Sequence, residues 1–162
     1  MKILLISDTH GELDITRAIL QKHMDIDLCL HLGDIGFDLT QLPYSITAVR
    51  GNHDRNTRLP KKLKLKLEGH KLLALHGNIF DDETVQEVFA MKHVADEDLM
   101  ELCMTTLYGK LAAYAKRKGC DILVFGHTHH QCQRIVDGVT LVNPGSIALG
   151  TPDSGYAIMT IK

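Results

Sequence analysis

The sequence predicts a layered α/β fold, because short apolar runs typical of buried strands alternate with amphipathic stretches typical of helices. A strand–helix–strand order at the start of the chain is the first indication of such a fold. The 162 residues, of which 44% are hydrophobic, are enough for one well-packed domain and too few for two. The sequence contains no internal repeat, low-complexity segment or linker, so we expect a single domain over residues 1–162.

The first part of the chain predicts three strands and one helix. The apolar run Lys2–Ser7 indicates a buried strand, and Asp14 is expected to cap the helix that follows. The apolar stripe of that helix would consist of Ile15, Ala18, Ile19 and Met24. Residues 27–32 and 45–49 predict the next two strands, with a loop or short helix near residues 37–42 between them.

The remaining strands are predicted from alternation, short apolar runs and turn signals. Residues 63–67 alternate leucine with lysine, and a Glu-Gly turn leads into the returning strand at 71–75. We interpret the lysines as a solvated face that discourages edge-to-edge pairing. Residues 122–125 predict a buried strand, the segment 134–142 a hairpin with an Asp-Gly turn, and residues 156–161 a closing strand.

Two helices are expected between residues 80 and 119. Asp81 or Asp82 would cap the first, whose apolar side chains are Val85, Val88, Phe89 and Met91. The second begins at Asp96 and ends before Gly119, and its acidic start and basic end suit the helix dipole. Its core-facing stripe would consist of Leu99, Leu102, Cys103, Leu107, Leu111 and Tyr114.

Composition excludes several classes of protein. A formal net charge of -2 and a pI near 6.5 give no overall basic surface for nucleic acid or an anionic membrane. The N-terminal run turns polar too early for a signal peptide, and no apolar stretch approaches the length that spans a bilayer. The four cysteines lack the Cys-x-x-Cys spacing, so we expect reduced, mostly buried thiols in a cytoplasmic protein.

Side chains that can bind metal follow five of the predicted strands, each within a few residues of the strand end. The seven candidate ligands are Asp8, His10, Asp34, Asn52, His76, His127 and His129. Strand ends in an α/β sheet gather at one crevice, so we expect these side chains to meet. Seven ligands are too many for one catalytic zinc, and they suit two divalent ions that share a carboxylate. Mixed carboxylate, imidazole and amide ligation without thiolate favours Mn, Fe, Co, Ni or Zn over Ca.

Two further groups of residues are less informative by themselves. We interpret the histidines outside the motifs as ordinary polar groups of the fold; these are His23, His31, His70, His93 and His130. The segment Asn143–Ser146 is either a simple Pro-Gly turn or a loop that closes over the site.

Five motifs, in their order along the chain, resemble those of calcineurin-like metallophosphoesterases. They are Asp8-x-His10, Gly33-Asp34, Gly51-Asn52-His53-Asp54, His76-Gly77 and Gly126-His127-x-His129. The short length, together with Val142-Asn143-Pro144-Gly145-Ser146, resembles the small YfcE-like phosphodiesterase branch of this family. The resemblance implies a two-sheet β-sandwich flanked by helices (an αββα fold) with a dinuclear metal site at the strand ends.

The resemblance also implies which side chains would bind each ion. Asp8, His10 and His129 would bind the first ion, and Asn52, His76 and His127 the second, with Asp34 bridging the two. Manganese is the first choice for both ions, with Ni, Co, Fe, Zn or Mg as alternatives.

The chain departs from the family pattern in four places, one of which is Gln131, where the small branch often has Pro. Phe37 stands where many members have a second Asp, so a supporting carboxylate is missing unless Asp38 takes its place. His53 is present where much of the small branch has Cys, so the fuller catalytic set is kept. Residues from about 82 to 104 resemble a helical insertion relative to the minimal branch, and substrate preference does not carry over across it.

The resemblance implies a metal-dependent phosphodiesterase that hydrolyses small phosphodiesters, and two ions of this kind would support attack by a metal-bound hydroxide. His53 would give a proton or hydrogen bond to the leaving oxygen, and Asp54 would orient His53. Arg50 would either contact a phosphate oxygen or be a surface charge at the strand end.

Alternatives to this activity stay open at the level of the sequence. The same fold serves as an interaction scaffold in a retromer subunit, and phosphomonoesterases and nucleases share the motifs. The expected partner is a small phosphoester substrate, without a membrane or nucleic acid. A homo-oligomer is also considered, formed through the insertion at residues 82–104.

Overall fold

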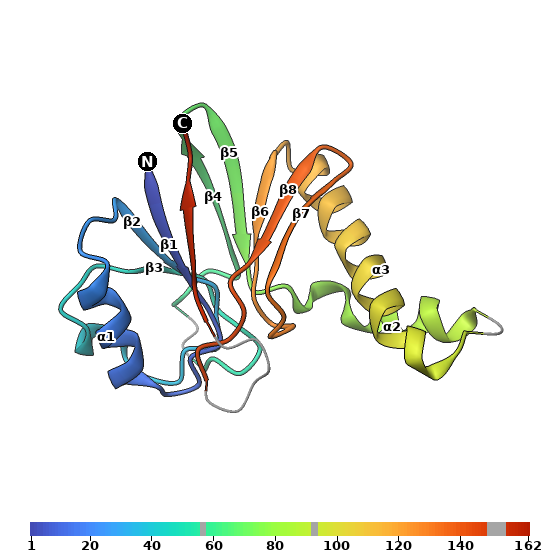
Figure 1. Ribbon diagram of the computed structural model, residues 1–162, viewed down its shortest axis with the longest axis horizontal. Helices are drawn as coiled ribbons and strands as arrows, with labels where there is room; N and C mark the ends of the chain where they lie inside the picture. The colour runs from blue at the N-terminus through green and yellow to red at the C-terminus, as the bar shows by residue number, and fades with distance from the viewer. Residues whose placement is uncertain (56–57, 92–93, 149–154) are drawn as a thin grey trace.

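Figure 1 shows the computed structural model, which describes the chain except for residues 56–57, 92–93 and 149–154. Two β-sheets form the centre of the molecule. The four-stranded sheet has the order β3 (Thr47–Ala48), β2 (Leu28–His31), β1 (Lys2–Ile6), β9 (Ala157–Thr160). The five-stranded sheet has the order β4 (Lys62–Leu67), β5 (His70–Leu75), β6 (Ile122–Val124), β8 (Val139–Asn143), β7 (Cys132–Val136).

Strand β1 is entirely apolar from Ile3 onward because both of its faces are covered. Ile3 and Leu5 pack against the five-stranded sheet, and Leu4 and Ile6 pack on the outer side with helix α1 (Leu13–Lys22). The parallel pairing of β1 with β2 places Ile6 beside His31, so both strands end at the same edge. Polar residues that follow the two strands are therefore neighbours.

Helix α3 (Asp96–Arg117) covers the outer face of the five-stranded sheet (Figure 1). Its buried residues Leu107 and Leu111 share a cluster with Leu73 and Leu123 of that sheet. The layers are thus helix, sheet, sheet, helix, which confirms the expected two-sheet architecture flanked by helices.

Most predicted elements are present, with shifted ends. The strands expected at 2–7, 27–32 and 63–67 are β1, β2 and β4, whereas the one expected at 45–49 is reduced to the two residues of β3. The short helix expected near residues 37–42 is a 3-10 turn, η1 (Leu39–Gln41).

The expected cap of α1 was wrong. The helix begins at Leu13, and Asp14 lies in its first turn, where it pairs with Arg17 at 2.9 Å. Thr16 and Leu20 are the buried residues of this helix, and Met24 lies beyond its end and is exposed. Gly11 has a φ of +96°, so the chain turns sharply here and the helix starts before the side chain chosen as its cap.

Helix α2 (Asp81–Ala90) buries fewer apolar residues than its sequence predicted. Val88 is buried, whereas Val85, Phe89 and Met91 are exposed. The helix lies outside the two sheets and packs on α3, where Lys110 reaches Glu87 at 2.7 Å (Figure 1). One narrow face of α2 is therefore covered, and the expected insertion at 82–104 comprises most of α2 and the start of α3.

All four cysteines are free thiols, as expected from their spacing. Burial raises the pKa of the Cys29 thiol to about 12, so this side chain behaves as a small apolar group. Among the described residues, no helix is both long enough and apolar enough to cross a membrane.

Candidate metal centre

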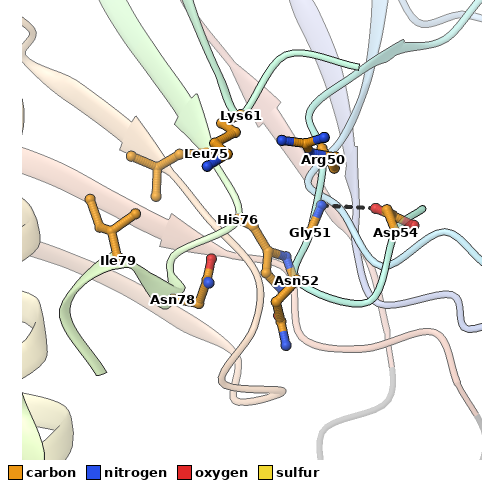
Figure 2. A pocket seen from close by; sticks show the side chains of 9 residues that line it. All are labelled: Arg50, Gly51, Asn52, Asp54, Lys61, Leu75, His76, Asn78 and Ile79. Atoms are coloured by element: carbon orange, nitrogen blue, oxygen red, sulfur yellow. Dashed lines mark hydrogen bonds between the residues drawn. The ribbon is translucent and has the colours of Figure 1, made fainter. Parts of the chain in front are cut away.

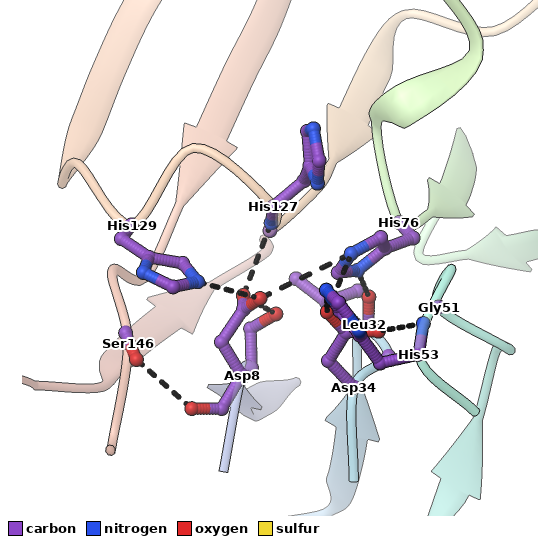
Figure 3. Close-up of polar contacts among 12 residues, drawn as sticks. Asp8, Leu32, Asp34, Gly51, His53, His76, His127, His129 and Ser146 are labelled. Atoms are coloured by element: carbon purple, nitrogen blue, oxygen red, sulfur yellow. Dashed lines mark hydrogen bonds and ion pairs between the residues drawn. The ribbon is translucent and has the colours of Figure 1, made fainter. Parts of the chain in front are cut away.

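The candidate ligands follow the ends of β1, β2, β3, β5 and β6, and Figure 3 shows those after β1, β2, β5 and β6 at one edge of the two sheets. Many have an unusual backbone. Among the described residues, seven that are not glycine have a positive φ, and five of these are Asp8, His10, Asp34, His127 and His129. Such conformations cost energy and gather at functional sites, where they direct side chains toward a ligand. The local backbone thus directs these side chains toward one another at this edge of the sheets.

The Asp8 carboxylate lies at the centre of one group of ligands. It is fully buried, and its Oδ1 lies 3.1 Å from His129 Nε2 and 3.9 Å from His10 Nε2. The other oxygen, Oδ2, accepts hydrogen bonds from Ser7 Oγ at 2.5 Å and from the His127 N–H at 3.0 Å. Two protein donors therefore fix the carboxylate, and Oδ1 is left facing the imidazoles.

Asp34 lies between the two groups of imidazoles. Its Oδ2 is 3.3 Å from His76 Nε2, 3.8 Å from His10 Nε2 and 4.0 Å from His53 Nε2, while its Oδ1 accepts the His53 N–H at 2.9 Å. Burial opposes ionisation of this carboxyl, but the interactions with His76 and with the His53 N–H lower its pKa to about 2. Asp34 is thus an ionised acceptor at the centre of the site.

His76 carries the clearest indication that the site fits a cation. Its Nδ1 donates to the Leu32 carbonyl at 2.8 Å, so Nε2 is the nitrogen whose lone pair is free. This Nε2 is buried and has no hydrogen-bond partner among the described residues, and it faces the carboxylates of Asp34 at 3.3 Å and Asp8 at 4.0 Å. A lone pair facing two carboxylates is the donor set that a divalent ion satisfies.

Two sets of side chains are each close enough to hold one ion. One set is Asp8, His10 and His129, and the other is Asp8, Asp34 and His76. Asn52 lines the same pocket as His76 (Figure 2). The second set therefore contains Asp8, which was expected for the first ion, and does not include His127, which was expected for the second.

His127 has a partner that sequence analysis missed as a site residue. Its Nε2 donates to Asp81 Oδ2 at 2.6 Å, which leaves Nδ1 as the nitrogen available to an ion. The ring centroids of His127 and His76 are 5.1 Å apart. Asp81 or Asp82 was expected to cap α2, but both lie in its first turn, and the side chain of Asp81 bonds His127. A usable signal was that α2 starts soon after β5 ends, which brings its first turn to the edge where the ligands lie.

His53, the expected proton donor, lies at the open rim of the site. Its side chain is 69% exposed, and its ring centroid is 5.6 Å from that of His10. Asp54 was expected to orient His53, but its carboxylate bonds the backbone instead. Oδ2 accepts from the N–H groups of Asp34 and Gly51, and Oδ1 from that of Ile35, all at 2.8 Å. Asp54 therefore ties the loop after β3 to the loop after β2.

Close backbone approach explains two glycines of the motifs. A Cβ on Gly51 would lie 2.1 Å from Asp34 Oδ1, and one on Gly126 would lie 1.9 Å from Ser7 Oγ. Any side chain at these positions would displace Asp34 or the Ser7–Asp8 pair.

The end of β8 and the loop that follows it hold the ligand-bearing turns in place through hydrogen bonds. Asn143 donates to Gly126 O at 2.8 Å and Thr128 Oγ1 at 3.0 Å, and Ser146 Oγ donates to Asp8 O at 2.9 Å. Asn143 and Ser146 are buried, so this part of the loop is a support for the ligand-bearing turns. These residues lie too far from their partners in sequence for local patterns to reveal the contacts.

His31 and its hydrogen bonds join the first two ligand-bearing loops. Its Nδ1 accepts the Gly33 N–H at 3.1 Å, so its Nε2 donates to Thr9 Oγ1 at 3.0 Å, and that hydroxyl donates to Ile35 O at 2.7 Å. Burial lowers the pKa of His31 to about 3, so the ring is neutral and fully bonded. This matches its interpretation as an ordinary polar group of the fold.

Other side chains outside the motifs also have hydrogen-bond partners in the fold. His23 contacts Tyr156 Oη at 2.7 Å, and His70 Nδ1 lies 2.5 Å from Asp121 Oδ2. Asp38 caps η1 by accepting the Thr40 N–H at 2.9 Å, so it does not supply the missing carboxylate near Phe37. His93 lies outside the described residues.

Comparison with known proteins gives concordant results. The family model of the calcineurin-like phosphoesterase superfamily domain matches residues 1–162. A probable metallophosphoesterase of Mycoplasma pneumoniae is 30% identical over 150 residues, covering 91% of this chain and 80% of that protein. The phosphodiesterase MJ0936 of Methanocaldococcus jannaschii is 28% identical over 157 residues, covering 90% of this chain and 83% of that protein.

Solved structures share the fold over almost the whole chain. A predicted phosphoesterase from Streptococcus pneumoniae superposes with a TM-score of 0.71 at 25% identity, covering 99% of this chain and 83% of that one. Vps29 from Entamoeba histolytica, crystallised with zinc, gives 0.68 at 21% identity, covering 100% and 87%. The phosphoesterase Yfce from E. coli gives 0.60 at 23% identity, covering 99% and 88%.

Proposed function

Because the chain belongs to the calcineurin-like phosphoesterase superfamily, we propose that it hydrolyses small phosphodiesters at a centre of two divalent ions. Hydrolysis of phosphoester bonds is the activity of this family. The observation that carries the proposal is His76 Nε2, a buried lone pair without a partner among the described residues, facing Asp34 and Asp8. The choice of a diester over a monoester follows the resemblance to phosphodiesterases.

The seven ligands would divide between two ions. Asp8, His10 and His129 would hold one ion, and Asn52, His76 and His127 the other, with Asp34 between them. The central position of Asp34 Oδ2, within 4 Å of His10 Nε2 and His76 Nε2, supports the bridging role. The ions, with Mn as first choice and Ni, Co, Fe, Zn or Mg as alternatives, would make bound water more acidic and neutralise charge on the phosphate.

His53 would deliver a proton from Nε2 to the leaving oxygen. The support for this role is its place on the exposed rim, with Nε2 4.0 Å from Asp34 Oδ2. The exposed edge of the ring gives access to a substrate. General acid catalysis of this kind contributes roughly 10²–10⁴-fold to a rate.

A contact surface for a second copy of the chain is the second candidate function. The observation that favours it is the exposed apolar side chains of α2 and the start of α3, Val85, Phe89, Met91 and Met100. Sedimentation of the wild type and of Phe89→Lys would test this surface, because a dimer formed through it would dissociate in the variant while hydrolysis continued.

The decisive experiment is hydrolysis after metal reconstitution. The protein is stripped of metal, Mn, Ni, Co, Zn or Mg is added singly, and a chromogenic phosphodiester is followed beside its monoester. We expect diester turnover that depends on metal, vanishes in Asp34→Asn and survives in Asp82→Asn, a matched change at an exposed carboxylate. Protein that binds two ions yet turns over neither ester would overturn the proposal.

Variation of the leaving group tests His53 separately. His53→Ala is expected to bind both ions and to lose most activity on diesters with poor leaving groups, and least on p-nitrophenyl esters. Equal losses across a series of leaving groups would exclude the role of proton donor.

A further inference from the structure

A cavity of about 310 Å³ adjoins the candidate metal centre on the side of Asn52 and His76 (Figure 2). Asn52 and His76, which line the cavity, are two of the proposed ligands. A molecule whose phosphorus lies at the ions therefore also reaches this space. The volume is at the lower end of the range for small-molecule sites. It accommodates a small group attached to the reacting phosphate.

Two cationic side chains, Arg50 and Lys61, lie on the same wall of the cavity (Figure 2). The Arg50 N–H donates to the Pro60 carbonyl at 2.8 Å, and this backbone bond holds the two side chains near each other. Within the described part of the chain, neither makes an ion pair with a carboxylate. Two cations placed together without an acidic partner attract an anion.

The one acidic residue of the cavity does not neutralise them by direct contact. Asp54 has both carboxylate oxygens engaged by three backbone N–H groups. Charge is also unevenly distributed in the sequence. The chain as a whole has a formal net charge of -2, yet residues 50–62 contain one acid and five cations, which are Arg50, Arg55, Arg58, Lys61 and Lys62.

The remaining walls suit an anion attached to a short organic group. Asn78 adds an amide that can donate a hydrogen bond, and Leu75 and Ile79 provide apolar surface. Apolar walls reduce the local dielectric constant, which strengthens the attraction between a bound anion and the two cations.

We propose that this cavity binds a second anionic group of the substrate, so that the preferred substrates are phosphoesters that also carry a carboxylate or a further phosphate. The proposal rests on the proposed phosphoesterase function for the identity of the reacting group. The cavity itself, with Arg50 and Lys61, supplies the selectivity.

Two diesters that differ by one charge test the selectivity. Phenyl p-nitrophenyl phosphate and 4-carboxyphenyl p-nitrophenyl phosphate release the same chromophore. With the metal-loaded wild type, we expect KM to be about fivefold lower for the carboxylate, with little change in kcat, because one exposed ion pair between a cationic side chain and a carboxylate contributes about this much. The preference should weaken as sodium chloride rises from 50 mM to about 0.5 M.

Variants at one position connect the preference to Lys61. Lys61→Met should lose the preference for the carboxylate and hydrolyse the uncharged-ring diester as the wild type does, and Lys61→Arg should restore the preference. Lys66→Met makes the same charge change on the exposed face of β4 and should keep the preference. Equal effects of Lys61→Met and Lys66→Met would overturn the proposal, since they would indicate an effect of net charge alone.

Anion binding to metal-free protein separates this proposal from the proposed function. Inorganic pyrophosphate is titrated calorimetrically into metal-free wild type, Lys61→Met and Lys66→Met. Weaker binding in Lys61→Met alone supports the anion site, even if the metal-loaded protein hydrolyses no ester, in which case the phosphoesterase proposal fails by itself. Identical binding by all three proteins refutes the anion site, whatever the activity.

Discussion

The carboxylate of Asp54 offers a sharp test, because two different roles predict different results. The sequence predicted that it orients His53, whereas in the structure its two oxygens accept hydrogen bonds from the N–H groups of Asp34, Ile35 and Gly51, each at 2.8 Å. In the first role its loss slows proton transfer. In the second its loss releases the loop that bears Asp34 and so weakens metal binding.

The magnitude follows from the three hydrogen bonds. Asp54→Asn keeps the shape but places an NH₂ group against at least one N–H donor, which loses one charge-assisted bond worth about 1.5–3 kcal/mol. Asp54→Ala leaves all three donors without this acceptor. Water can reach a partly buried site, so we expect a loss in the free energy of unfolding of roughly 3–5 kcal/mol.

Urea denaturation of the metal-free proteins measures the stability, and calorimetric titration with Mn²⁺ measures the affinity. If Asp54 clamps the loop that bears Asp34 through these three hydrogen bonds (the Asp54 clamp), both variants lose stability and bind Mn²⁺ at least about tenfold more weakly, with Asp54→Ala the more affected. Unchanged stability and metal affinity, together with a loss of kcat that grows as the leaving group becomes poorer, would refute the clamp and restore the role of orienting His53.

Three further predictions concern other parts of the site. Asp81→Asn should lower the affinity for the ion held by His127 about 10–100-fold, because His127 Nε2 loses the carboxylate that orients the ring. Asp82→Asn should leave this affinity unchanged. Titration with Co²⁺, followed by its absorption spectrum, measures the difference. Gly51→Ala should destabilise the protein by about 1–3 kcal/mol and abolish metal binding, because its Cβ would lie 2.1 Å from Asp34 Oδ1. Gly109→Ala, in open space on α3, should be neutral or stabilising. Urea denaturation of both variants measures the difference in stability. The buried His31 should make the metal-free protein less stable in acid, because its pKa of about 3 lies below the ordinary 6.5 and the unfolded chain therefore takes up the proton first. The free energy of unfolding should fall as the pH drops from about 6.5 toward 3, by up to roughly 4 kcal/mol. Denaturation at pH 7, 5 and 4 should show a shallower fall in His31→Gln than in the wild type, and parallel curves would contradict this.

The sequence determined the architecture and predicted the residues of the candidate metal site. Apolar runs give the strands and the long helix, because each pattern depends on neighbours within a few residues. The candidate ligands could be predicted for the same reason, since Asp8, Asp34 and His76 each lie within three residues of a strand end and strand ends meet at one edge.

Only the tertiary structure decided which partner each polar side chain takes. Asp54 bonds the backbone of Asp34, 20 residues away, and Asp81 bonds His127, 46 residues away. Ser146 supports Asp8 across 138 residues. Similarly, α2 exposes Val85 and Phe89 although its sequence resembles an ordinary amphipathic helix, because it packs on α3 and lies outside the two sheets. Such contacts depend on how distant segments pack, and a local pattern contains no information about the element that will lie opposite.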